Sequence, residues 1–183
     1  MPLAGKKEVG VAKREFDLAL RKFISEVNGK EINREPTVDI SNLNKMIDGT
    51  KVTTATYNHN KKPVAVKPGD VVTYTLRIFN EGNRAGYAEL VKDDIPEGLV
   101  FLPENKTNID HRWKMYKEDG TETDNPKEAD YIETDYLSKA QEEETGRVTL
   151  LKAFNPETMT QPDYHDIKVA FEVTEPNTSD RII

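Results

Sequence analysis

Alternating apolar and polar residues are the main pattern in this chain, and they predict β-strands. Successive side chains of a strand point to opposite faces, so a period of two gathers the apolar residues on one face. The clearest segments are 71–80 and 165–174. Further short strands are expected at 15–25, 52–57, 63–66, 87–92, 99–102, 111–116, 131–137 and 147–154.

Turn-forming residues separate these segments at intervals of about ten residues, which is typical of all-β proteins. Asn28-Gly29 between apolar residues predicts a hairpin, and a short helix is expected within 41–47. The pattern favours an all-β fold, an antiparallel immunoglobulin-like β-sandwich with long loops and at most a short helix. We expect a flexible leader at 1–14 and one domain over 15–183.

A charged residue occupies an apolar position of the first predicted strand. Lys22 shares its face with Phe16, Leu18, Leu20 and Ile24, so it points toward the expected core. Burial of an ammonium group is costly and favours the neutral amine, which is a nucleophile. Two other interpretations remain open. Lys22 can bury only its stem at the sheet rim, or the strand can have the opposite phase, with Phe23 facing inward.

Composition and charge exclude several classes of protein. The chain has 183 residues, of which 36% are hydrophobic and 32% charged, and its net charge is −7. This acidity argues against nucleic acids and anionic membranes as partners. The absence of cysteine excludes disulfides, thiol catalysis and iron–sulfur clusters. No apolar run is long enough to span a membrane, and the first residues are not expected to form a signal peptide, since no apolar stretch follows their charges.

Motifs for cofactors, metals and turnover catalysis are missing. His59, His111 and His165 lie far apart in the sequence without further metal-ligating partners, so no zinc site is expected. The oxygen-rich loop 119–130 departs from the helix–loop–helix calcium pattern. A solvated acidic loop is favoured there, and an irregular calcium site remains open. Neither a serine nucleophile motif nor a phosphate-binding loop is present, which disfavours a turnover enzyme.

A second candidate residue, Asp93, precedes the turn at Pro96. In the segment before this turn, Tyr87, Val91 and Asp93 share a face, so Asp93 points inward while Asp94 points to solvent. From the residues alone, the favoured interpretation is a carboxylate that caps the turn.

Several segments together resemble the isopeptide-forming domains of Gram-positive surface and fimbrial proteins. Residues 16–24 resemble the lysine strand of that family. Residues 68–76, with Asn80-Glu81-Gly82, resemble its Gly-Asp-x-Val-x-Tyr-Thr strand and its Asn-x-Gly turn, and residues 93–99 resemble its Asp-x-Leu-Pro-x-Gly-Leu motif. The segment 134–138 is also similar to that family.

The resemblance implies a chemistry and a location. A lysine on the first strand of these domains joins an asparagine on the last strand, assisted by an acid, in a single turnover that needs no cofactor and no metal. It implies that Lys22 is the nucleophile and Asp93 the acid, with Phe16, Tyr74 and Phe171 as apolar walls. It also implies a monomeric domain at the cell surface or in a pilus, next to other domains of a surface protein.

The acceptor asparagine is where the sequence departs from the family. It is expected on a strand after the turn 175–180, whereas Asn80, Asn155 and Asn177 lie at a strand end or in loops. We therefore expect the last strand to be missing, and a β-strand peptide carrying Asn or Asp to be the partner. The competing hypothesis is a passive adhesin or spacer that binds a ligand or calcium without any covalent cross-link.

Overall fold

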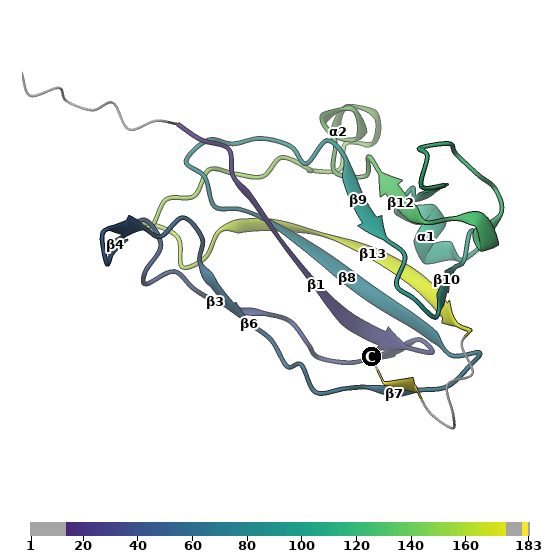
Figure 1. Cartoon of the computed structure of the whole chain (residues 1–183). Coiled ribbons are helices and arrows are strands. Elements are labelled where there is room, and N and C mark those ends of the chain that lie inside the picture. The colour runs from purple at the N-terminus through teal and green to yellow at the C-terminus, as the bar shows by residue number, and fades with distance from the viewer. Residues whose placement is uncertain (1–13, 175–180, 183) are drawn as a thin grey trace, which may run out of the picture.

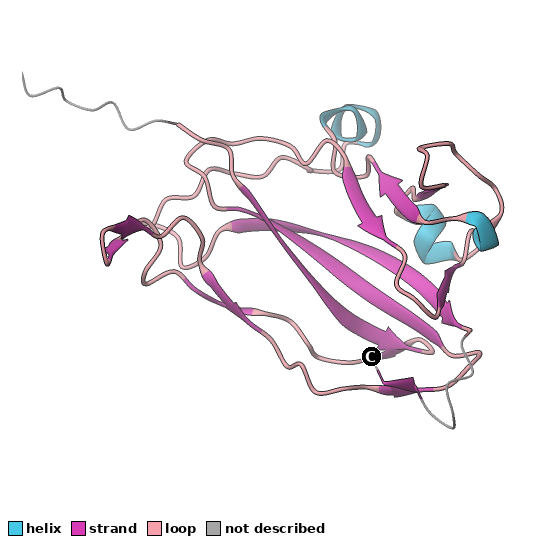
Figure 2. Ribbon diagram, viewed as in Figure 1, coloured by secondary structure: helices cyan, strands magenta, loops and turns pink. Residues whose placement is uncertain are grey.

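Antiparallel β-sheets dominate the computed structural model, which describes residues 14–174 and 181–182 (Figures 1 and 2). The strands are β1 (Leu18–Val27), β2 (Lys30–Glu31), β3 (Thr37–Asp39), β4 (Met46–Ile47), β5 (Thr50–Lys51), β6 (Thr56–Asn58), β7 (Ala65–Val66), β8 (Val71–Asn80), β9 (Val91–Asp94), β10 (Leu99–Phe101), β11 (Lys114–Tyr116), β12 (Tyr131–Thr134), β13 (Asp163–Val173) and β14 (Arg181–Ile182). The helices are α1 (Lys106–Asp110), α2 (Lys139–Thr145) and the 3-10 turn η1 (Pro126–Glu128). The predicted all-β class is confirmed.

The largest sheet has the strand order β10-β13-β8-β1-β2, and every neighbouring pair is antiparallel. Its centre is β8, which pairs with β1 on one side and with β13 on the other. Leu76 of β8 lies opposite both Lys22 and Ile167 in these two ladders. The two clearest predicted strands, 71–80 and 165–174, correspond to β8 and β13.

A three-stranded sheet, β11-β12-β9, shares its buried side chains with the large sheet. Ile132 of β12 and Met115 of β11 belong to the same apolar cluster as Leu76, Ile167 and Phe171. Three ribbons of two strands each complete the sheets: β3-β6, β4-β5 and β7-β14. The opposite face of the large sheet is also covered, because Phe79 is fully buried there and its ring lies 4.7 Å from that of Tyr57 on β6.

Several predicted elements differ from the structure. The strand expected at 87–92 begins only at Val91, and the segment expected as a strand at 147–154 is irregular, pairing through Leu151 with Gly86 alone. The helix expected within 41–47 is absent, since β4 begins there. Two short α-helices form where at most one helix was expected. Side-chain caps explain both of them: Asn105 and Ser138 accept backbone N–H groups at their N-termini.

Parts of two expectations lie outside the described residues. These are residues 1–13 of the expected leader and, at the other end, the turn 175–180 and Ile183. Within the described ranges, no helix is long and apolar enough to cross a membrane.

The irregular segment around Leu151 contributes to the core as much as a strand does. Leu151 is fully buried, whereas Leu90 is 59% exposed. We expect Leu151→Ala to lower the free energy of unfolding by about 2–5 kcal/mol, through lost burial and the cavity it leaves. Leu90→Ala is the matched control, with an expected change within about 0.5 kcal/mol. Urea unfolding measures both, and equal effects of the two substitutions would contradict this account of the core.

Candidate functional site

The structure brings Lys22 and Asp93 together from two different sheets. Lys22 lies in the middle of β1, and Asp93 lies on β9 opposite Ile132. The Lys22 Nζ atom donates a hydrogen bond to Asp93 Oδ2 over 2.8 Å, although 71 positions separate the two residues in the chain. Packing of the three-stranded sheet against the five-stranded sheet therefore creates this contact.

The Lys22–Asp93 pair is largely shielded from water. The side chain of Lys22 is 24% exposed and that of Asp93 is 14% exposed. The Lys22 Nζ atom lies 4.8 Å from the ring centre of Tyr74 and 5.8 Å from that of Phe171. Aromatic faces at this distance stabilise a cation and also exclude solvent. The site thus combines a charged pair with two walls of the apolar core.

Burial raises the pKa of the Asp93 carboxyl above its ordinary value, and the neighbouring charge of Asp94 acts in the same direction. The charge and the hydrogen bond of Lys22 oppose this shift without cancelling it. Transfer of one proton over the 2.8 Å contact converts the ion pair into a neutral amine and a neutral carboxylic acid. That neutral pair is the state from which an amine can attack a carbonyl carbon.

The edge of β1 beside Lys22 is open among the described residues. On one side β1 pairs with β8 over its length, whereas on the other side β2 pairs only with Glu26 and Val27. Because the Asp17 carbonyl accepts the Glu81 N–H, the backbone groups of alternate residues, including Lys22, point away from β8. An unpaired edge of this kind accepts an added strand through main-chain hydrogen bonds.

Two apolar residues expected in the core lie at this open edge instead. Leu18 and Leu20, which share the face of Lys22, are each 41% exposed, so the expectation that they point into the core is wrong. Only Ile24, near the end of β1, is buried on that face. Phe16, expected as a wall of the site, packs its ring against Gly86, where an added Cβ would lie 2.7 Å from the ring. Tyr74 and Phe171 do lie beside Lys22.

The asparagines considered as acceptors are engaged elsewhere. Asn80 is fully buried, and its amide nitrogen donates to the carbonyl groups of Arg84 and Lys152. The Asn155 side chain accepts the backbone N–H of Glu157 in a turn. Asn177 lies outside the described residues. Neither described asparagine is placed for attack by Lys22.

Other candidate chemistry finds no support in the described part of the chain. No group of three or more His, Asp or Glu side chains there is arranged to hold a metal ion. In the loop 119–130, Asp119 and Asp130 accept backbone N–H groups of Thr121 and Glu118. A cavity of about 510 Å³ lies on the other face of β1, where the Arg77 guanidinium pairs with Asp166 and Glu35. It contains neither Lys22 nor Asp93.

Comparison with protein-family models, curated proteins and solved structures found no match to this chain. The candidate function therefore depends on the geometry of the Lys22–Asp93 pair and on the sequence resemblance.

The raised pKa of Asp93 gives a direct test of this environment. In ¹³C NMR titrations of the aspartate carboxyls, Asp93 should titrate above its ordinary value of 3.8. Lys22→Met should raise that pKa further, because the lysine charge lowers it. Asp119 in the same spectra is the control, since its hydrogen bond with Thr121 lowers its pKa. Titration of Asp93 at or below the ordinary value would contradict the expected environment.

The raised pKa of Asp93 also determines how this carboxyl changes the stability of the fold with pH. The folded protein holds the Asp93 proton more tightly than the unfolded chain does. The contribution of this group to stability is therefore fully present below the ordinary pKa and is lost as the pH rises through the raised value.

Proposed function

We propose that this chain is an isopeptide-forming domain with an immunoglobulin-like β-sandwich fold, from a Gram-positive cell-surface or pilus-like protein. In this proposal Lys22 becomes joined to an Asn or Asp side chain on a strand that pairs with β1. The observation that carries the proposal is the 2.8 Å contact between Lys22 Nζ and Asp93 Oδ2 beside two aromatic rings. Core side chains shared by the two sheets support the sandwich arrangement.

The proposed reaction begins with the neutral forms of Lys22 and Asp93. The Asp93 carboxyl donates a hydrogen bond to the acceptor amide oxygen and makes its carbon more electrophilic. The Lys22 amine attacks that carbon, and a new C–N bond forms. The bond from the carbon to the amide nitrogen of Asn, or to the hydroxyl oxygen of a protonated Asp, then breaks. Asp93 relays the proton from the lysine nitrogen to the leaving group, which departs as ammonia, or as water when the acceptor is Asp. Asp93 ends in its starting state.

The surroundings of the pair favour this reaction over hydrolysis. Tyr74 and Phe171 restrict water near the amine, and a strand held along β1 fixes the acceptor side chain beside Lys22. The open edge of β1 offers the hydrogen-bonding groups for such a strand. The product is a covalent tie between two strands, which serves a cysteine-free protein as a disulfide serves others.

A passive adhesin or spacer module is the alternative that an experiment has to separate. There the Lys22–Asp93 pair would be only an ion pair between sheets. Intact mass spectrometry of the denatured chain distinguishes an internal bond first, since condensation with Asn removes about 17 Da and with Asp about 18 Da.

Ligation to a strand peptide is the main test. The chain is incubated with synthetic peptides of about twelve residues, long enough for one strand, that alternate apolar and polar residues around a central Asn or Asp. We expect a covalent product that survives denaturation and has lost ammonia or water. Lys22→Arg should abolish it, because a guanidinium stays protonated. Asp93→Asn should slow the reaction by at least about 100-fold.

Lys92→Arg is the matched control, because Lys92 lies next to Asp93 on β9 but its amine lies over the ring of Tyr131. This variant should ligate at the wild-type rate. A folded wild-type chain with an unshifted mass that ligates no peptide would refute the proposed chemistry and favour the passive module. Fragment mapping by tandem mass spectrometry identifies the joined lysine.

A further inference from the structure

Three buried side-chain nitrogens lack a hydrogen-bond partner among the described residues: Arg34 Nε, His59 Nδ1 and Arg147 Nε. Buried polar atoms in folded proteins are almost always paired, so each exception needs an explanation. Two of these three atoms belong to one group of side chains next to β1. Arg34 is 9% exposed, and its Nη1 atom donates to the carbonyl groups of Asn60 and Lys62.

Positive charge is concentrated around these two nitrogens. We call Arg21, Arg34, His59 and Lys61 the basic cluster. Burial lowers the pKa of His59, and the charges of Lys61, Arg21 and Arg34 lower it further, so these cations lie near its ring. No described carboxylate forms an ion pair with Arg21 or Arg34, although the whole chain carries a net charge of −7.

Two of the described acidic residues near Arg21, Glu81 and Asp17, form no ion pair with this cluster. Oxygen Oε2 of Glu81 already accepts the Ala55 N–H and the hydroxyl groups of Thr54 and Tyr57. Asp17 immediately precedes β1 in phase with Arg21, two steps of the alternation away, and its pKa is raised by burial and by Glu81 and Glu15. The guanidinium groups of Arg21 and Arg34 are therefore available to bind an added anion.

The basic cluster lies beside the open edge of β1, on the face opposite to Lys22. The Arg21 guanidinium is centred 4.3 Å from the ring centre of Tyr57, and the ring centres of Phe23 and His59 are 6.5 Å apart. Arg21 Nη1 also donates to the carbonyl oxygen of Leu20, a group that points away from β8. A strand that pairs with this edge would donate its own N–H to the Leu20 carbonyl. The Arg21 guanidinium could then donate to another acceptor.

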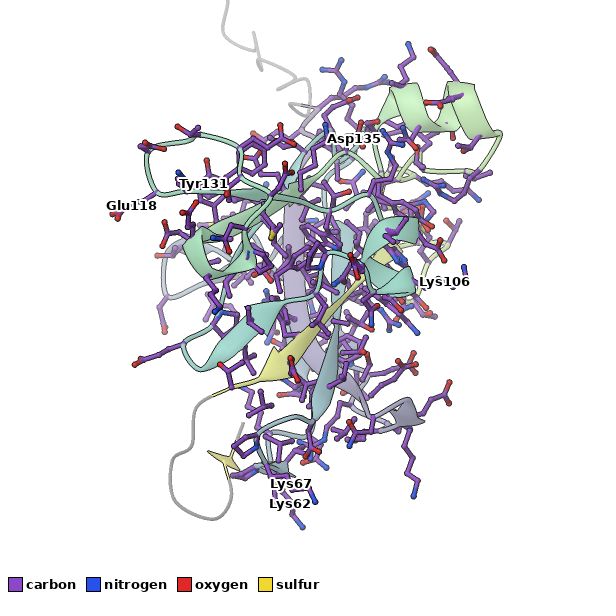
Figure 3. The ribbon with its side chains drawn as sticks, turned by 90° about the vertical axis from the view of Figure 1, so that its right-hand side faces the viewer. Lys62, Lys67, Lys106, Glu118, Tyr131 and Asp135 are labelled. Atoms are coloured by element: carbon purple, nitrogen blue, oxygen red, sulfur yellow. The ribbon has the colours of Figure 1, made fainter. Side chains whose placement is uncertain are left out.

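Two further lysines, Lys62 and Lys67, lie in the segment that connects the basic cluster to β8. The side chains of Lys62 and Lys67 are found at the end of the molecule that holds β7 and β14 (Figure 3). On the face away from Lys22 the open edge is thus lined by cations, whereas on the face of Lys22 it carries the exposed apolar side chains of Leu18 and Leu20. A strand added there would meet two different environments on its two faces.

We propose that the strand accepted at the edge of β1 carries carboxylate side chains in the positions next to its acceptor residue, where they bind the basic cluster. Alternation puts the acceptor on the face of Lys22 and its two sequence neighbours on the face of Arg21 and His59. The inference rests on the proposed function, and it adds the chemistry of the partner: an acidic strand rather than a neutral or basic one.

Binding without ligation tests this inference independently of the reaction. Three fluorescein-labelled peptides share an apolar face and a central Asn, and the two neighbours of that Asn are both Glu, both Gln or both Lys. Fluorescence anisotropy gives their affinities for the Lys22→Met chain, which cannot form the bond. We expect the Glu peptide to bind about ten times tighter than the Gln peptide, and the Lys peptide to bind most weakly. High salt should reduce the preference.

Further substitutions in the Lys22→Met chain show which residues cause the preference for the Glu peptide. Arg21→Gln and His59→Gln should each weaken binding of the Glu peptide several-fold and leave the Gln peptide nearly unchanged. Lys114→Gln on β11 is the control and should change neither. Equal affinities for the three peptides, binding of none of them, or a preference that survives both substitutions would overturn the inference. Circular dichroism confirms that each variant is folded.

The two proposals fail in different ways. If the Glu peptide binds selectively but forms no covalent product with the wild-type chain, the isopeptide chemistry is refuted and the acidic-strand inference stands. If all three peptides ligate to the wild-type chain and bind the Lys22→Met chain equally well, the chemistry stands and the inference is refuted.

Discussion

The contact between Lys22 and Asp93 is the interaction on which the site depends, because it puts a charge and its counter-charge where water is scarce. Burial alone disfavours both ions, and mutual attraction favours both. In this site burial outweighs the lysine for Asp93, whose pKa stays raised. The site therefore holds a carboxyl group of raised pKa within hydrogen-bonding distance of an amine.

This contact requires both sheets. Lys22 is fixed by the ladder between β1 and β8, and Asp93 by the ladder between β9 and β12. The apolar cluster that joins the sheets, including Leu76 and Ile132, sets the distance between the two strands. Phe171 belongs to the same cluster and borders the lysine. The packing that stabilises the fold thus also sets the polarity of the site.

The sequence predicted the parts of this arrangement that depend on local pattern. The strands β8 and β13 follow from their alternation, and the inward direction of Asp93 follows from its phase with Val91. The helix α2 was not predicted, although Ser138 and the left-handed Gly146 are helix caps. The exposure of Leu18 and Leu20 was missed because alternation assigns a face to a residue but does not show what covers it.

If the proposed bond forms, its irreversibility changes where selectivity has to arise. Once the amide forms, the strand cannot leave, so a wrong partner must be rejected while docking is still reversible. On the face of Lys22 the edge offers the apolar side chains of Leu18 and Leu20 and one amine, and these discriminate poorly among apolar strands. Charges on the opposite side act at longer range and during encounter. The two proposals together divide β1 into a reacting face and a selecting face, with Arg21 directly next to Lys22, and this division would meet both requirements within one strand.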